Sequence, residues 1–388
     1  MQIDFHYYAT YCAAYMAGYS HEESLDLCYS AQFVDCCTRT LLSGIGAPES
    51  AATTQLQLEM MEARTDLIGL QDITRIWASF HFLPYDLHAD VKRGSKVYKD
   101  KYRLICNTNS DLLVETVGLA KDRGLQAAGL AMHILADTWA HRYFAGTPSM
   151  VINNTNDYFF ELIPEGDAYR EEKVQFRHNP AGADQFGKYS YINTLYQLTE
   201  NSVMCLGHGR AGHLPDYSFM RYRYLPAWGS YEEIIKDNPS DYYHAFTQMI
   251  YALKFLRGEE AAFEKEHYDL EAAAPYEERI TEILEKRQPD ASADWKAFGE
   301  SLSGCEIPEF DIEKYQGEYR QAPKEEKDNT FLGQFIMAAM RQKSMVTNRI
   351  YKSGSLLAGY SIDYNEKGFG GIRDFMMLVR DVKREVSS

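Results

Sequence analysis

A helix that carries ionisable side chains among apolar ones is the feature that most limits how this chain can fold. The stretch HILADTWAH, residues 133–141, is otherwise almost entirely apolar or small. Its His133, Asp137 and His141 are four residues apart, and four residues turn a helix by about 400°, so the three side chains share one face. Burying three ionisable groups on one face is costly unless their charge is compensated. The stretch therefore predicts a buried helix whose polar face meets a compensating partner, such as a metal ion.

The spacing along this helix predicts more than one ion. Each step of four residues rises by about 6 Å, so His133 and His141 lie roughly 12 Å apart along the axis, too far to bind one ion comfortably. Asp137 lies between them and offers two oxygens. A bridging carboxylate suits two metal ions that lie about 3.5–4 Å apart. We therefore expect at least two divalent ions with Asp137 between them.

Other segments offer further candidate ligands of the same chemical type. These are Asp4 and His6 in MQIDFHYY, Asp35 in YSAQFVDCC, His81 in WASFHFLPYD, and His208, His213 and Asp216 in LGHGRAGHLPD. Histidine and aspartate without cysteine suit zinc or another divalent ion at a hydrolytic site. The alternative for each residue taken singly, and for Asp35 above all, is a polar core residue that is hydrogen-bonded to a neighbouring helix.

Helical signals dominate the rest of the chain. Ser20 and Glu23 form a predicted capping box, and residues 110–144 are apolar at helical spacing, with Gly124 as a weak point. Further helices are predicted near 275–287, 292–302, 328–350 and 371–385. The best strand signals, at 150–154 and 173–178, are weak. We therefore predict an all-α fold.

The composition changes after about residue 258, where charged connecting stretches begin and histidines become scarce. We accordingly expect a helical metal-binding core at 1–258 and a helical C-terminal extension, 259–388, that packs on it.

Charge and cysteine content restrict the class of protein. The 388 residues carry a net charge of −16, which argues against nonspecific binding of nucleic acid backbone. The chain shows no basic N-terminal region of a signal peptide and no run of about 18 apolar residues, so no membrane span is expected. Seven cysteines without a C-x-x-C pair fit reduced thiols. We expect a cytoplasmic protein, and the sequence leaves its oligomeric state open.

Five motifs in one order carry a resemblance to a known superfamily. They are DFHYYATYCAAYMAGYS, YSAQFVD, SFHFLP, HILADTWAHRYFAG and GHGRAGHLPD. Together they resemble the zinc-dependent phospholipase C fold, which is shared with the single-strand-specific zinc nucleases, and more closely an uncharacterised bacterial branch of that superfamily. The resemblance covers roughly residues 1–230. It implies an all-helical bundle that gathers up to three zinc ions.

The resemblance also implies roles for particular residues. Asp35, His81, His133 and Asp137 would hold one zinc, and Asp137 would bridge to a second zinc that His6 also binds. A third zinc would take His141, but the His-x-x-x-Glu pair that follows in the phospholipases is missing here. Either His208 or His213 substitutes, or the third site is absent. The superfamily also uses a free N-terminal amine as a ligand, a role that Asp4 could take in this chain.

The chemistry that the resemblance implies is hydrolysis of a small-molecule or lipid-like phosphoester. The metal ions would activate a water molecule, and Asp35 would position or deprotonate it. Arg210, Arg221 and Arg223 could clamp the phosphate beside the aromatic residues of 217–228, or they could pair with surface carboxylates instead. The alternative function is a non-catalytic helical protein that uses the metal ions as structural staples or binds a partner. An open coordination position distinguishes a catalytic zinc from a structural one.

Overall fold

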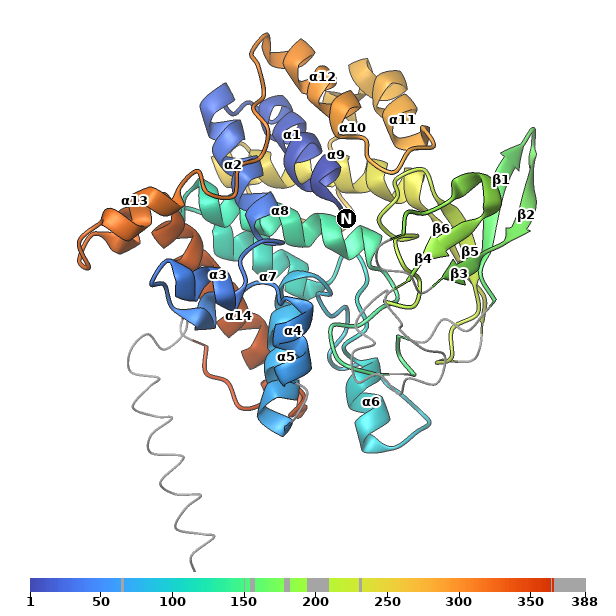
Figure 1. The fold of residues 1–388 in the computed structure, drawn as a ribbon, viewed down its shortest axis with the longest axis horizontal. Helices are drawn as coiled ribbons and strands as arrows, with labels where there is room; N and C mark the ends of the chain where they lie inside the picture. The colour runs from blue at the N-terminus through green and yellow to red at the C-terminus, as the bar shows by residue number, and fades with distance from the viewer. Residues whose placement is uncertain are drawn as a thin grey trace, which may run out of the picture.

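A computed structural model of the chain describes residues 1–63, 66–149, 151–153, 158–177, 182–193, 209–229, 232–363 and 365. Helices make up most of these residues (Figure 1). The α-helices are α1 (Thr10–Met16), α2 (His21–Phe33), α3 (Arg39–Gly44), α4 (Gln57–Ala63), α5 (Leu67–Phe80), α6 (Lys96–Tyr102), α7 (Asp111–Ala120), α8 (Leu125–Ala140), α9 (Asn238–Arg257), α10 (Leu270–Ala273), α11 (Glu277–Glu285), α12 (Ser292–Ser303), α13 (Gln316–Gln321) and α14 (Phe331–Lys352). A π-helix, η1 (Asp4–Ala9), precedes α1.

The predicted all-α fold is wrong, because two β-sheets form between α8 and α9 (Figure 1, green, at the right). An antiparallel sheet has the strand order β2-β1-β5-β6, and a parallel pair joins β3 to β4. The strands are β1 (Phe160–Glu165), β2 (Ala168–Lys173), β3 (Gln175–Arg177), β4 (Ser190–Ile192), β5 (Arg221–Tyr224) and β6 (Ile234–Asp237). The fold is therefore mixed α/β.

The length and the charge of these strands explain the error. Each has three to six residues, too few to show a clear period of two. β2 has the sequence AYREEK and is largely exposed, so it looks like a charged surface loop. Among the strands of the described residues, β5 alternates fully: Tyr222 and Tyr224 are buried, and Arg221 and Arg223 are half-buried. The predicted strand at 173–178 falls on the end of β2 and on β3, whereas 151–153 forms turns.

Helix α8 lies at the centre of the helical part and packs against α2, α7, α9 and α14. The apolar region predicted at 110–144 forms two helices, α7 and α8, separated at Gly124, whose φ is 85°. Gly129 allows α2 to approach α8 closely, since a Cβ there would lie 2.3 Å from the carbonyl oxygen of Leu27. Because Gly129 is one turn before His133, this close approach brings the end of α2 towards the ionisable face of α8.

The helices after residue 258 add to the same hydrophobic core as the N-terminal helices. α12 packs on η1 and α1, and α14 packs on α5 and α8. The helices predicted near 275–287, 292–302 and 328–350 correspond to α11, α12 and α14, while 371–385 lies outside the described residues. The predicted capping box of α2 is confirmed, with both of its hydrogen bonds formed. In the described part of the chain, no helix is both long and apolar enough to cross a bilayer.

Candidate metal centre

The ends of three helices meet at one place and deliver three of the candidate ligands. His81 is the C-cap of α5, His141 is the C-cap of α8, and Asp35 follows the C-cap of α2. The C-terminus of a helix carries a partial negative charge from its unpaired carbonyl groups. The meeting of three such ends therefore favours a positive charge between them.

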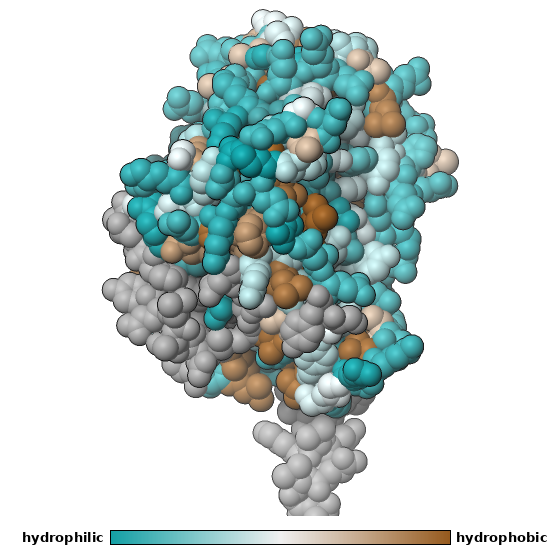
Figure 2. All heavy atoms as spheres, turned by 90° about the vertical axis from the view of Figure 1, so that its right-hand side faces the viewer, coloured by the Kyte–Doolittle hydropathy of each residue, from teal (hydrophilic) through white to brown (hydrophobic). Residues whose placement is uncertain are grey.

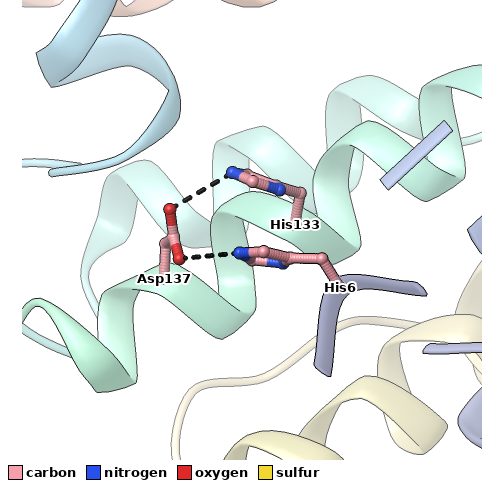
Figure 3. A group of neighbouring side chains, drawn as sticks. All are labelled: His6, His133 and Asp137. Carbon is pink, nitrogen blue, oxygen red and sulfur yellow. Dashed lines mark ion pairs between the residues drawn. The ribbon is translucent and has the colours of Figure 1, made fainter. Parts of the chain in front are cut away.

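Two more candidates come from α8 itself and one from η1. Figure 3 shows His133 and Asp137 one turn apart on α8, with His6 reaching them from the N-terminal segment. The rings of His6 and His133 stack with centroids 3.8 Å apart. Short π-helical segments such as η1 are often found at functional sites, because the wider turn redirects a side chain.

Four of the ligand candidates place one atom each around a common point. Oδ2 of Asp137 lies 3.1 Å from Nδ1 of His81 and 3.2 Å from Nε2 of His133. These two ring nitrogens are 3.3 Å apart. Oδ1 of Asp35 lies 3.8 Å from the His81 nitrogen and 3.9 Å from the His133 nitrogen. Separations of this size are those expected between ligand atoms that share one zinc ion.

The other oxygen of Asp137 belongs to a second set of atoms. Oδ1 of Asp137 lies 3.1 Å from Nε2 of His6 and 3.1 Å from the α-amino nitrogen of Met1. The same amino nitrogen lies 3.1 Å from Oδ1 of Asp216 and 3.3 Å from Nε2 of His141. Asp137 thus joins the two sets, one through each oxygen.

The cluster is closed except at one residue. The side chains of His6, His81, His133 and Asp137 are at most 4% exposed, whereas the side chain of Asp35 is 32% exposed. Solvent therefore reaches the first set of ligand atoms at Asp35.

Backbone carbonyls fix which ring nitrogens face the cluster. Nε2 of His81 donates to the carbonyl oxygen of Thr53 at 3.0 Å, and Nδ1 of His141 donates to that of His81 at 2.8 Å. Because a carbonyl oxygen only accepts, these nitrogens carry the hydrogens. The opposite nitrogens, Nδ1 of His81 and Nε2 of His141, therefore face the cluster, and a ring fixed in this way is typical of metal-binding histidines.

One peptide segment holds both His81 and the surroundings of Asp35. Thr53 accepts from His81, donates through its hydroxyl to the carbonyl of Val34 at 2.6 Å, and donates through its amide to Cys37 at 2.9 Å. Nζ of Lys343, on α14, donates to the carbonyls of Ser50 and Ala52 in this segment at 2.7 and 2.6 Å. Residues 50–53 therefore link α14 to two candidate ligands.

The charges in the cluster shift the pKa values of its members in opposite directions. Burial alone would raise the pKa of Asp137, but its interactions with His141, the Met1 ammonium, His133 and His6 hold it well below its usual range. Burial opposes the charge on the Met1 amine, yet Asp137, Asp216 and Asp35 outweigh this and raise its pKa to about 11. Burial and the neighbouring His133 lower the pKa of His6 to about 4. At neutral pH, Asp137 is ionised and His6 is neutral.

The residues of the cluster fit a bound metal ion. Within the described residues, Nδ1 of His6 and Nδ1 of His133 are buried without a hydrogen-bond partner, while Nε2 of these rings faces Asp137 at 3.1 and 3.2 Å. In the same part of the chain, no lysine or arginine lies within 4.0 Å of the Asp35 or Asp137 carboxylate. Two groups could each hold an ion: His6, His133 and Asp137, and Asp35, His81 and His133.

Other predicted site residues have partners away from the cluster. The carboxylate of Asp4 accepts from the amides of Phe5 at 2.8 Å and Ala291 at 3.1 Å. On β5, Arg221 pairs with Asp237 and Glu285, and Arg223 pairs with Glu171 and Glu233.

In the 207–213 motif, the described Arg210 and His213 contact residues that are not members of the cluster. Arg210 is half-buried, and its carbonyl accepts from Asn193. His213 lies in the same turn as Asp216, three residues before it. Its Nδ1 lies 3.2 Å from Oδ2 of Asp184. His208 lies outside the described residues.

Sequence reasoning missed the Met1 amine as a member of the cluster and Asp184 as the partner of His213, whereas Asp216 was among the candidate ligands. The Met1 amine occupies the place near His6 that was assigned to Asp4, and Asp216 contacts both this amine and His141. Met1 had a signal, since it lies only five residues before His6 in the sequence. Asp184 had none, because only the fold brings it to His213.

Comparisons with known proteins place the chain by family alone. Comparison with curated proteins finds no match, and comparison with solved structures finds none either. The profile of a family of unknown function, DUF6765, matches residues 1–350, a range that includes every residue of the cluster. The chain belongs to the DUF6765 family.

Proposed function

We propose that this protein is a metal-dependent hydrolase of phosphoesters with a site for two or three zinc ions. The observation that carries the proposal is a buried His and Asp cluster that is open to solvent only at Asp35. A structural metal site is closed by protein ligands, whereas a catalytic site keeps a position for water or substrate; with four protein ligands at the first ion, that position would be a fifth one beside the exposed Asp35.

Asp35, His81, His133 and Oδ2 of Asp137 would hold the first ion. Zinc binds nitrogen and oxygen at about 2.0–2.2 Å, so the ligand atoms of a tetrahedral site lie about 3.3–3.6 Å apart. The measured separations of 3.1–3.9 Å bracket this range. The side chains are thus arranged in advance, and binding would require little movement.

The second set of ligand atoms would hold one or two further metal ions. Oδ1 of Asp137, Nε2 of His6 and the Met1 amine would hold a second ion, and His141 with Asp216 would contribute to a third. The amine binds a metal only after it loses its proton, which its raised pKa opposes. Metal binding at this set should therefore release protons and strengthen as the pH rises.

The bound ions would supply Lewis-acid chemistry, lowering the pKa of a water molecule and neutralising phosphoryl oxygens. Asp35 is the exposed carboxylate at the mouth of the cluster, so it is placed to orient that water and accept its proton. The fully buried Asp137 cannot reach the solvent and serves to hold the ions together. The two carboxylates therefore have different roles because of their different burial.

The alternative is a non-catalytic protein with structural ions, which the near-complete burial of His6, His133 and Asp137 favours. The test is hydrolysis of generic phosphomonoesters and phosphodiesters by zinc-loaded protein, with Asp35→Asn as the variant. The proposal predicts turnover in the wild type and a loss of at least about 100-fold in the variant, the usual range for a general base. Zinc-loaded protein that binds its ions but hydrolyses none of the esters would favour the structural role.

A further inference from the structure

Helix α6 lies at the lower end of the molecule in Figure 1, within a segment whose charge is opposite to that of the chain. The chain as a whole has 40 basic and 56 acidic residues. Residues 90–103 contain only Asp90 and Asp100 as acids, but their basic residues are Lys92, Arg93, Lys96, Lys99, Lys101 and Arg103. This segment is thus a local positive region on an acidic protein.

The cations of this segment are not neutralised by the protein. Lys92, Arg93 and Lys96 are exposed and Lys99 is half-buried. Among the described residues, no carboxylate lies within ion-pair distance of these four side chains, in contrast to Arg221 on β5, which has two acidic partners. Their charge is therefore available to an external anion.

The cations border a hollow on the surface. This hollow has a volume of about 430 Å³ and is lined by Gly94, Lys96, Lys99, Asp100, Arg103, Ser353 and Gly354. Gly354 leaves open space at one side of the hollow, and Ser353 adds a hydroxyl group. The hollow is large enough for a phosphate group and presents three cations against one carboxylate.

Exposed aliphatic side chains lie beside the hollow. Val97 on α6 is 58% exposed, and Leu356, two residues after the lining Gly354, is 61% exposed. Leu67 and Ile68 at the start of α5 are each 69% exposed, and Gln71, one turn later, donates to the carbonyl of Leu356 at 3.1 Å. Figure 2 shows hydrophobic and hydrophilic atoms side by side at the lower end of the molecule.

We propose that the α6 surface, formed by Lys92, Arg93, Lys96, Val97, Lys99, Arg103 and Leu356, docks the protein on a membrane that contains anionic lipids. Unpaired cations would face the phosphate headgroups, and the aliphatic side chains would enter the boundary between headgroups and acyl chains. A nucleic acid would use the cations but leave the aliphatic side chains in water. The docking does not depend on the metal centre, which lies elsewhere in the chain.

The experiment is co-sedimentation of the full chain with phosphatidylcholine vesicles that either contain or lack phosphatidylglycerol. The protein should bind only the anionic vesicles, and added salt should weaken binding because it screens the cations. Lys96→Gln and Lys99→Gln should each weaken binding about fivefold, the usual effect of one basic residue at an anionic surface. Val97→Ser should weaken it without changing the salt dependence.

A matched control comes from Lys324→Gln, since Lys324 is also exposed and lies far along the chain, after α13. This variant should bind vesicles as the wild type does. Equal binding to neutral and anionic vesicles, or no binding to either, would overturn the proposal. Titration with inorganic phosphate is the second arm: phosphate binding that needs Lys96, without vesicle binding, would make the hollow a small-anion site and overturn membrane docking.

Discussion

The metal centre and the antiparallel sheet beside it differ in how their charged side chains are buried and paired. In the metal centre, the carboxylate of Asp137 is 1% exposed and has histidines and an amine around it, with no lysine or arginine within 4.0 Å among the described residues. On the sheet, Arg223 has a carboxylate on each side, from Glu171 and Glu233, near the solvent. In the first arrangement the carboxylate is paired with the Met1 ammonium and with histidines that can also bind a metal ion, and in the second the ion pairs are complete without a ligand.

This difference separates residues that the sequence presented together as one site. His133, Asp137, Arg221 and Arg223 were all candidates for the same phosphate chemistry. The first two lie in a buried group of side chains that could hold a metal ion, whereas the last two already pair with carboxylates. A buried ionisable group without a matching charge is expensive, so it indicates a ligand that the chain must acquire. An exposed ion pair contributes little and indicates no ligand.

The largest effect should follow the removal of charge from the centre. Asp137→Asn replaces the carboxylate that joins both sets of ligand atoms, so the variant should bind zinc more than about 100-fold more weakly, beyond the 10–100-fold range of outer-shell changes. Asp35→Asn should retain more metal, because Asp35 contributes to one set. Zinc affinity measured by competition with a chromophoric chelator compares the two variants. Equal affinities for both variants and the wild type would contradict the bridging role.

A smaller effect should follow from weakening the support of the centre. Lys343→Met removes the two hydrogen bonds to Ser50 and Ala52 and frees the segment whose Thr53 carbonyl holds His81. We expect zinc affinity to fall about 10-fold, as is usual when a group that supports a metal-binding histidine is removed. Lys343→Arg keeps a donor and should restore most of the affinity. A Met variant that loses stability but binds zinc as tightly as the wild type would show that Lys343 serves only the packing of α14.

The smallest effect should come from the sheet. Arg223→Lys keeps the charge of an exposed ion pair and loses only its forked geometry, so the free energy of unfolding should change by less than about 0.5 kcal/mol. Zinc content and ester hydrolysis should stay at the wild-type level, because Arg223 already has two acidic partners. A large loss of turnover with unchanged stability would instead assign Arg223 to phosphate binding and weaken the contrast between the two regions.

Local patterns explain what the sequence revealed about the fold. The capping box at Ser20 and the apolar periodicity of α8 depend on residues within a few positions of one another, and both are seen in the structure. The sheet depends instead on pairing between distant short strands, such as Phe160 with Arg223. No local period marks such a pairing, so the all-α prediction failed there.

The candidate site likewise combines residues that local spacing predicts with contacts that only the tertiary fold makes. Asp137 and His133 share a helix face and were predictable from spacing alone. The contact of Asp216 with the Met1 amine joins residues more than 200 positions apart, and only the tertiary fold brings them together. The Thr53 carbonyl that orients His81 could not be predicted from the sequence, because every residue carries a carbonyl and no side-chain type marks this one.

The most direct test of the account is the metal content of the purified protein. Elemental analysis of protein prepared without chelators and then resupplied with zinc should give at least two divalent ions per chain, since Asp137 offers one oxygen to each of two sets of ligand atoms. The same analysis of Asp137→Asn should give a clearly lower value. Less than one equivalent of any metal in the wild type after zinc resupply would contradict the account and leave the cluster as a polar core stabilised by its own hydrogen bonds.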